Sequence, residues 1–224
     1  MALYTYPDLT QRTDEWLTLR RGIVTASTVG RLITPRTIKP ADNPDSRALT
    51  MLLVSERITG WTEDTYVSSA MWRGVEDEPR AVETYRHAYA PVETVGFMVR
   101  DDGGCRIGYS PDGLVGNDGL IEVKSRSPKE HVRVVIEDAV PAEHMAQLQC
   151  GLLVSGRQWV DYISYCGGLP MWVKRVTPDQ RWHGAILTAV AAFEASATSL
   201  ISTFTTRTAG LPATERVIPD LIVV

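Results

Sequence analysis

The stretch GYSPDGLVGNDGLIEVKSR, residues 108–126, combines the signals of a β-hairpin with an unusual set of charges. Its turn LVGNDG predicts a chain reversal between two strands, because Asn, Asp and Gly tolerate the backbone of tight hairpins. Residues two apart in a strand share a face, so Glu122 and Lys124 project together while Ile121 and Val123 face the core. The sequence therefore predicts a hairpin that carries an acid and a base on one face.

Asp112, at the end of the preceding strand, leaves two interpretations of this hairpin open. Exposed hairpins often carry such charges as a solvated face, and the spacing alone does not exclude this. Alternatively, the reversal brings Asp112 close to Glu122, and two carboxylates repel unless a cation lies between them. A lysine beside them, Lys124, could hold a water or stabilise charge on a phosphate. Oxygen ligands, a divalent cation and a lysine are the parts needed to hydrolyse a phosphodiester.

The composition limits which class of protein and which metal to expect. The chain has 224 residues, 44% hydrophobic and 22% charged, which suits one globular domain. We expect a cytoplasmic protein, because no apolar run reaches the length of a membrane span and the first residues do not resemble a signal peptide. Cys105, Cys150 and Cys166 form no CxxC pair, and the four histidines lack zinc-site spacing. A metal would therefore have oxygen ligands, which favours Mg²⁺ or Mn²⁺ over zinc.

The order of predicted elements indicates an α/β fold. We expect a mixed central β-sheet flanked by helices on both sides, within one domain of three parts: a mainly helical part (1–90), the sheet (91–176) and a C-terminal helix with a tail (177–224). Periodicity and punctuation predict helices over 13–22, 25–33, 47–60, 68–90, 142–156 and 180–204, strands over 92–100, 105–113, 120–126, 159–166 and 171–177, and a loop over 34–46.

The charge distribution is uneven along the chain. The formal net charge is −4, which argues against a protein that coats nucleic acid. Residues 11–40, however, carry six basic side chains and two acids: Arg12, Arg20, Arg21, Arg31, Arg36 and Lys39 against Asp14 and Glu15. This segment is either a solvated helix face or a local surface that grips DNA.

Four segments together resemble a known family. They are EWLTLRRGIVTAS (15–27), WRGVEDEP (72–79), SPDGL with GLIEVKS (110–125) and HMAQLQCGLLVSGRQWVDYISY (144–165). Their motifs and their order are similar to those of the phage lambda exonuclease and YqaJ-like viral recombinase family, a branch of the PD-(D/E)xK nucleases. The resemblance implies a restriction-endonuclease-like core around the hairpin. The segment after about residue 170 carries no motif of this family.

The resemblance also implies roles for individual residues. Asp112 and Glu122 match the metal-binding acids, with the main-chain carbonyl of Val123 as a further ligand. Lys124 matches the catalytic lysine that positions or activates water, and Glu78 an upstream acid that helps to hold the metal or the water. Four further residues match positions that surround the DNA phosphates near the cut end in this family: Arg20, Ser27, Ser110 and Gln147. Arginine suits bidentate phosphate binding, and Ser27 is expected near a helix N-terminus that could hold an anion.

Simpler interpretations exist for several of these residues. Arg20 could be a solvated helix residue, Glu78 a surface or capping acid before Pro79, and Gln147 an ordinary polar residue of an amphipathic helix. His144, three residues before Gln147, is not expected to contact DNA. Three aromatic residues, Trp159, Tyr162 and Tyr165, are interpreted as sheet core.

These observations predict a Mg²⁺-dependent deoxyribonuclease, with Mn²⁺ able to substitute. The expected activity is 5′-to-3′ degradation of one strand from double-stranded DNA ends, in recombination or replication of a phage or prophage. The resemblance further implies a homotrimeric ring and a single-strand annealing protein as partner, and the lack of a long apolar run predicts no membrane attachment. The alternatives are a structure-specific or restriction-type endonuclease of the same fold, and a non-catalytic scaffold that binds DNA ends.

Overall fold

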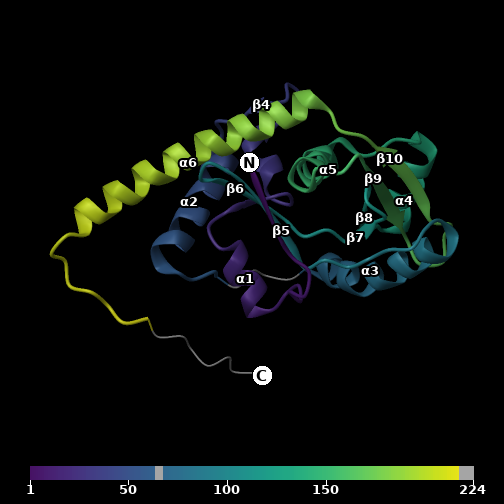
Figure 1. Cartoon of the computed structure of the whole chain (residues 1–224), viewed down its shortest axis with the longest axis horizontal. Helices are drawn as coiled ribbons and strands as arrows, with labels where there is room; N and C mark the ends of the chain where they lie inside the picture. The colour runs from purple at the N-terminus through teal and green to yellow at the C-terminus, as the bar shows by residue number, and fades with distance from the viewer. Residues whose placement is uncertain (64–67, 217–224) are drawn as a thin grey trace.

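The computed structural model describes residues 1–63 and 68–216, and their elements form an α/β fold with mixed sheets, as predicted (Figure 1). The α-helices in this part of the chain are α1 (Asp14–Arg20), α2 (Pro44–Thr59), α3 (Ser69–Ala88), α4 (Pro128–Glu137), α5 (Ala142–Ser155) and α6 (Gln180–Thr208), with a 3₁₀ helix η1 (Val29–Leu32). The strands are β1 (Ala2–Tyr6), β2 (Val24–Thr25), β3 (Ile33–Thr34), β4 (Lys39–Pro40), β5 (Phe97–Asp102), β6 (Cys105–Tyr109), β7 (Gly113–Val115), β8 (Gly119–Ser125), β9 (Trp159–Tyr165) and β10 (Trp172–Val176).

The strands form two four-stranded sheets where we expected one central sheet. The first has the order β1-β5-β6-β2 and the second β10-β9-β8-β7, while β3 and β4 pair by themselves. Both larger sheets are mixed, because β2 runs parallel to β6 and β8 runs parallel to β9. Residues Ser110, Pro111 and Asp112 join β6 to β7, so this tripeptide passes from one sheet to the other. Pro111 cannot donate a ladder hydrogen bond, which is consistent with a break at this point.

The N-terminal part of the chain agrees with prediction at α1 and differs after it. Helix α1 begins after Thr13, whose side chain accepts a hydrogen bond from Trp16 N, and the chain turns at Gly22 with a φ of 68°. The helix expected over 25–33 is wrong. Instead β2 pairs with β6, Ala26 N donates to Gly108 O, and only the short η1 follows. β-branched residues such as Val24 and Thr25 suit this strand.

Other differences from the expected layout have local causes. The loop expected over 34–46 contains β4, and α2 begins three residues before the predicted 47–60 because Asn43 caps it in a capping box with Ser46. Strand β1 and helix α4 were not predicted. The signal for α4 was present, since Ser127 and Glu130 form a capping box and Pro128 occupies the first turn.

Helix α3 packs against β8, and Gln147 of α5 reaches the side chains on the other face of this strand (Figure 1). Ile121 and Val123 are buried on the α3 side in a cluster with Val82, Tyr85 and Ile163, as the alternation predicted. The opposite face of β8 is turned toward α5. Burial on both faces makes this strand a rigid base for the charged residues it carries.

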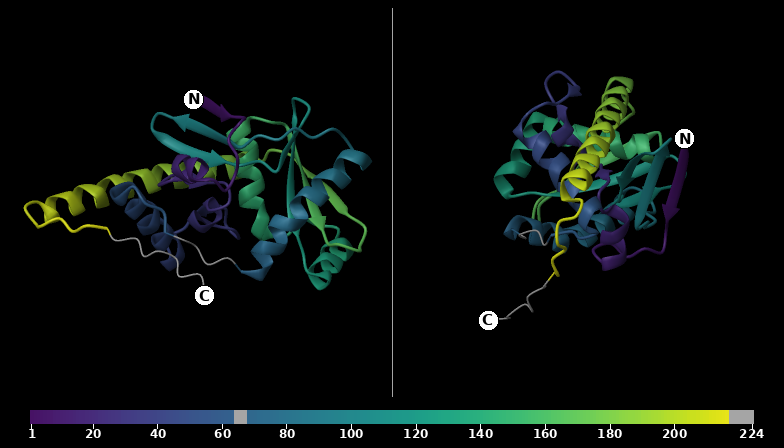
Figure 2. Two further views of the ribbon diagram at one scale, coloured as in Figure 1. Left: turned by 90° about the horizontal axis from the view of Figure 1, so that it is seen from below. Right: turned by 90° about the vertical axis from the view of Figure 1, so that its left-hand side faces the viewer.

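Helix α6 extends four residues beyond the predicted 180–204. By length and composition alone it could cross a membrane, whereas we expected no apolar run of that length. Its first half is a core helix: Trp182, Ile186, Val190 and Phe193 are buried in the main hydrophobic cluster. Its second half extends past the rest of the fold (Figure 2). The packing of the first half is that of a helix in a globular domain.

Candidate active site

The β7–β8 hairpin brings Asp112 to the middle of β8. The two strands pair with Gly113 opposite Ile121, and the turn between them contains Gly116 with a φ of 51°. A Cβ at Gly113 would lie 2.2 Å from Cγ1 of Val92, so a glycine is required there for close packing. The result is that Val123 N donates to Asp112 Oδ2 at 2.6 Å. Asp112 therefore lies beside Glu122 and Lys124, as predicted.

Helix α5 adds Gln147 to this group. Lys124 Nζ donates to Glu122 Oε1 at 2.8 Å and to Gln147 Oε1 at 2.9 Å. Gln147 Nε2 in turn donates to Glu122 Oε1 at 2.5 Å. Glu122 is only 2% exposed, and Tyr109 OH lies 3.5 Å from its second oxygen. These side chains hold one another in a single arrangement, because each polar atom of Gln147 has a committed partner.

The charges in this group perturb one another. Burial, and then the negative charges of Glu122 and Glu78, raise the pKa of Asp112 well above its ordinary value. Burial acts to lower the pKa of Lys124, but Glu122 and Asp112 outweigh it and the pKa of this amine is raised. Lys124 is therefore a cation at neutral pH. Burial also raises the pKa of Tyr109, so its hydroxyl stays protonated.

The available donors fit a hard divalent cation. Asp112 and Glu122 supply carboxylate oxygens, and a cation between them would offset both the burial of Asp112 and the repulsion from Glu122 and Glu78 that raise its pKa. In a strand, the N–H and C=O of one residue point to the same edge. Since Val123 N–H faces Asp112, the Val123 carbonyl faces that side as well. Two carboxylates and one carbonyl, completed by water, suit Mg²⁺.

Glu78 lies at the margin of this set. Its carboxylate pairs with Arg12 Nη2 at 2.9 Å, although its charge still reaches Asp112. Within residues 1–63 and 68–216, no three Asp, Glu, His or Cys side chains are grouped so that they could hold a metal ion. Glu78 would have to release Arg12 before it could act as a ligand.

Arg20 and Ser110 meet next to Asp112. The Arg20 guanidinium stacks on Trp16, 3.9 Å from the ring centroid, and Nη1 donates to Ser110 Oγ at 3.3 Å. Trp16 Nε1 donates to the same hydroxyl at 2.9 Å. Burial lowers the pKa of Arg20 to about 10, against the opposing effect of Glu56. Among the described residues Arg20 forms no ion pair, so a cation without a close acid partner contacts Ser110, two residues before Asp112.

Ser27 lies elsewhere than we expected. Its hydroxyl is 3.1 Å from Thr25 Oγ1, and the residue is exposed just after β2. The residue that precedes η1 is Thr28, and η1 has four residues. The expected anion site at a helix N-terminus is therefore wrong at this position, because the segment pairs with β6 instead of forming a helix.

Three residues that the sequence analysis did not assign to the site adjoin it: Arg126, Tyr162 and His144. Arg126 is the first residue after β8, two residues after Lys124, and its Nη2 donates to Tyr162 OH at 2.7 Å. The same nitrogen makes a short contact with His144 Nε2. Burial, with the nearby charges of Lys124 and Arg126, lowers the pKa of His144 to about 3. The i, i+2 spacing of Lys124 and Arg126 was the signal that could have indicated this extension.

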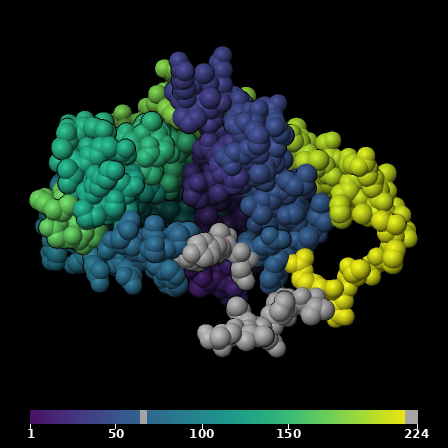
Figure 3. Space-filling model, turned by 180° about the vertical axis from the view of Figure 1, so that it is seen from behind, coloured from purple at the N-terminus to yellow at the C-terminus, as the bar shows by residue number. Residues whose placement is uncertain are grey.

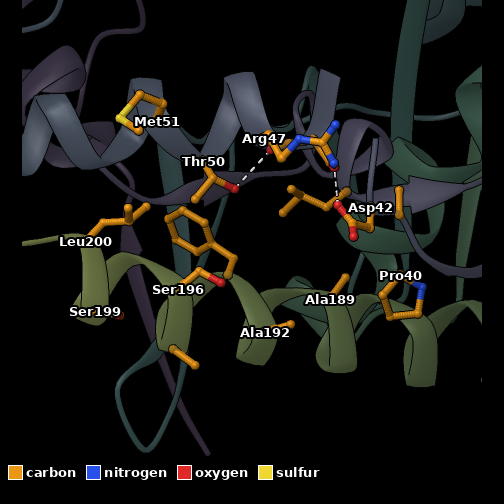
Figure 4. Close-up of a pocket in the computed structure, with 15 residues that line it drawn as sticks. Pro40, Asp42, Arg47, Thr50, Met51, Ala189, Ala192, Ser196, Ser199 and Leu200 are labelled. Atoms are coloured by element: carbon orange, nitrogen blue, oxygen red, sulfur yellow. Dashed lines mark hydrogen bonds and ion pairs between the residues drawn. The ribbon is translucent and has the colours of Figure 1, made fainter. Parts of the chain in front are cut away.

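The surface is hollowed between the N-terminal helical part, purple and blue, and the teal part that contains β8 and α5 (Figure 3). The contacts above place the site where these parts meet, since α1 supplies Arg20, α3 Glu78 and α5 Gln147. A separate groove of about 890 Å³ lies between α2 and α6, lined by residues such as Met51 and Ala192 (Figure 4). The predicted site residues do not line that groove.

Comparison with known proteins agrees with this geometry. The family described as YqaJ-like viral recombinase domain matches residues 15–158. An alkaline exonuclease, LHK-Exo, from Laribacter hongkongensis is 32% identical with a TM-score of 0.77, over 89% of this chain and 100% of that one. The same values hold for LHK-Exo in complex with dAMP. A phage-related exonuclease from Haemophilus somnus 129PT, 13% identical, has a TM-score of 0.65 over 81% of this chain and 96% of that one, which supports the fold alone.

No curated protein sequence matches this chain. The family match nevertheless covers more than half of the residues and includes the hairpin with Asp112, Glu122 and Lys124. The chain belongs to the YqaJ-like viral recombinase family and is a nuclease of the lambda exonuclease type.

Proposed function

We propose that this protein is a Mg²⁺-dependent exonuclease that degrades one strand of double-stranded DNA in the 5′-to-3′ direction from its ends. The observation that carries the proposal is the hydrogen-bonded set Asp112, Glu122, Lys124 and Gln147, with Arg20, which forms no ion pair among the described residues, beside it. DNA is the substrate class that the family indicates. The dAMP bound by LHK-Exo, a mononucleotide, supports release of single nucleotides.

The metal would be held by Asp112, Glu122 and the Val123 carbonyl, with Glu78 as a further acid, and Mn²⁺ would substitute. A divalent cation at this position supplies polarisation of the phosphoryl oxygens and neutralises charge as it develops. Lys124 Nζ, charged and held by Glu122 and Gln147, directs a positive charge toward the attacking water and the phosphate. Because the Lys124 amine also donates to Gln147, it is held between Gln147 and Glu122 and does not pair with Glu122 alone.

We assign recognition of the DNA end to Arg20 and Ser110, which lie next to Asp112. Arg20 has no acid partner among the described residues, and Ser110 offers a hydroxyl next to it. A 5′-phosphate is a doubly charged acceptor that suits a bidentate guanidinium. Ser27, exposed near the parallel β2–β6 pair, would contribute a hydroxyl from the side chain alone.

We propose a closed homo-oligomer, most simply the trimeric ring that the family resemblance implies, and the charge of the chain supports it. An exonuclease that stays on DNA through many cuts needs either a large basic surface or topological enclosure. With 27 acids against 23 lysines and arginines, the chain has few residues to form a large basic surface. Contacts between unlike surfaces that close on themselves form a ring around the substrate. A single-strand annealing protein would take the 3′ strand that remains, and both would act in the cytoplasm.

One digestion experiment separates this proposal from its alternatives. A linear duplex labelled at either 5′ end and a relaxed circle of the same sequence are incubated with the protein, with and without Mg²⁺. We expect mononucleotides from the 5′ ends of the linear duplex, an intact circle, and no reaction with a chelator. Cutting of the circle would indicate an endonuclease, and binding of ends without cleavage would indicate a scaffold.

A further inference from the structure

We propose that Arg126 binds the DNA phosphate next to the scissile phosphate on its 3′ side. This inference rests on the proposed function and adds a substrate contact to the same site. Arg126 lies two residues after Lys124, and β8 continues in register there, because Arg126 N donates to Tyr165 O at 2.8 Å. Its side chain thus shares the face of Glu122 and Lys124. It lies about 7 Å of strand rise beyond Lys124.

The guanidinium of Arg126 is held by neutral groups only. Its Nη2 donates to Tyr162 OH and contacts His144 Nε2, and neither partner carries a negative charge. Tyr162 is fully buried in β9, and His144 packs on its ring with 5.6 Å between centroids. The aromatic pair therefore fixes where the guanidinium lies without neutralising it.

The protein leaves part of this guanidinium without a hydrogen bond. Arg126 Nε is fully buried and has no partner among the described residues. Nη1 also has no partner there, and it is not among the fully buried atoms. A buried polar group without a partner is unfavourable, and more so when it is charged. An anion that reaches Nη1 would neutralise the charge of the guanidinium and give Nη1 a partner.

Two acids lie in the neighbourhood of Arg126, Glu130 and Glu143, and neither forms an ion pair with it among the described residues. Glu130 accepts hydrogen bonds from Ser127 N and Oγ in the capping box of α4, at 3.2 and 2.9 Å. Glu143 is exposed at the start of α5, and its Oε1 lies 3.9 Å from Nε2 of His144. In the described part of the chain Arg126 takes part in no salt bridge with either. Its positive charge therefore remains available to a ligand.

The order of groups along the site decides which phosphate Arg126 would bind. Arg20 and Ser110 lie on the Asp112 side, and Arg126 lies beyond Lys124 on the other side. If the terminal 5′-phosphate sits at Arg20 and the scissile phosphate at Asp112, Glu122 and Lys124, the following phosphate reaches Arg126. This is the phosphate between the second and third nucleotides.

The test combines variants with a substrate in which one phosphate is neutral. Duplexes carry a single methylphosphonate at this position or at one farther along the strand, and release of the first nucleotide is measured in single turnover. For wild type, the methylphosphonate at the second-to-third linkage should slow release by about 10–150-fold, as expected for a charge-assisted contact. On unmodified DNA, Arg126→Ala should release the first nucleotide about as slowly as wild type does on the methylphosphonate duplex. The methylphosphonate at the second-to-third linkage should not slow this variant further.

Two variants and one binding measurement complete the experiment. Arg126→Lys keeps the charge and should recover part of the rate, while Arg133→Ala, an exposed arginine on α4, should behave like wild type in every arm. In chelator, the affinity of Arg126→Ala for a fluorescent duplex should depend less on salt, with a log–log slope lower by about 0.9. A fold defect alone would not produce this change.

The contradicting results are specific. If Arg126→Ala keeps the full methylphosphonate penalty, or wild type shows none at that linkage, Arg126 does not bind this phosphate. If Arg126→Ala fails to fold, the position scan on wild type and Arg126→Lys decides the question. If wild type releases no nucleotide from unmodified duplex, the proposed function itself fails, which is a separate outcome.

Discussion

Lys124 and Gln147, which are 23 residues apart in the sequence, share a hydrogen bond of 2.9 Å between the amine and the side-chain carbonyl oxygen. The amide nitrogen of the same Gln147 donates to Glu122. Helix α5 therefore does more than cover the sheet, because it fixes the distance between the acid and the base of the hairpin.

Gln147 is expected to contribute to catalysis, whereas Gln149, two residues later, is expected to contribute to stability. Gln147→Ala should reduce kcat by about 10–100-fold with little change in stability, because it frees the Lys124 amine. Gln149 is buried and bonds to Thr177 O and Asp179 N. Gln149→Ala should lower the Tm by about 2–4 °C per kcal/mol lost and leave kcat near wild type. Kinetics and thermal unfolding of both variants check this, and a kcat loss confined to Gln149→Ala would contradict it.

Asp112→Asn is expected to stabilise the metal-free protein. The pKa of Asp112 is raised in the folded state, so between its ordinary value and the raised one the folded protein binds more protons than the unfolded chain. The free energy of unfolding therefore falls as pH rises through this window and remains lowered above it. Asparagine can still accept from Val123 N and carries no charge, so the Tm in chelator at pH 8 should rise.

The same variant tests the metal assignment. Mg²⁺ should raise the Tm of wild type by neutralising Asp112 and Glu122, and it should have little effect on Asp112→Asn. Differential scanning calorimetry with and without Mg²⁺ gives both comparisons. A variant that is less stable in chelator, or that responds to Mg²⁺ like wild type, would contradict the assignment.

Arg20→Ala should slow digestion of 5′-phosphorylated ends by about 10–150-fold, the range expected for loss of a charge-assisted phosphate contact. The effect on 5′-hydroxyl ends should be smaller, so the preference between the two ends narrows. Arg21→Ala is the control, since Arg21 contacts Thr62 Oγ1 and not Ser110. Rates on the two ends measure the preference, and an unchanged preference would mean that Arg20 is a surface residue.

Light scattering in dilute buffer should give about three times the chain mass of 24.8 kDa. Once begun, digestion of a long duplex should continue after addition of excess competitor DNA, because an enclosed strand cannot exchange. A monomer at micromolar concentration that stops on challenge would exclude the ring and leave the nuclease assignment intact.

The charged face of the hairpin was predictable because two local rules suffice for it, although the strand predicted over 105–113 is two strands, β6 and β7, in different sheets. The turn residues and the two-residue period together place Glu122 and Lys124 on one face and Ile121 and Val123 on the other. The partnership of Arg20 with Ser110 was only implied by family resemblance, since 90 residues separate them. Periodicity carries no information about such long-range contacts.

The failures also have physical causes. The residues around Ser27 were predicted as a helix, but pairing with β6 decides their conformation, and no local signal shows that partner. The division of the strands into two sheets arises where the chain leaves the first sheet after Tyr109 and enters the second at Gly113. Arg126 was overlooked because its partners, Tyr162 and His144, come from β9 and α5.

The central claim is that Asp112, Glu122 and Lys124 form a metal-dependent nuclease centre. Its most direct test is digestion of a 5′-labelled linear duplex by wild type and Lys124→Ala, each shown to be folded, in Mg²⁺ and in chelator. We expect labelled mononucleotide only from wild type with Mg²⁺, because the variant lacks the charge beside the attacking water. A folded Lys124→Ala that cuts at nearly the wild-type rate, or cleavage by wild type in chelator, would contradict the claim.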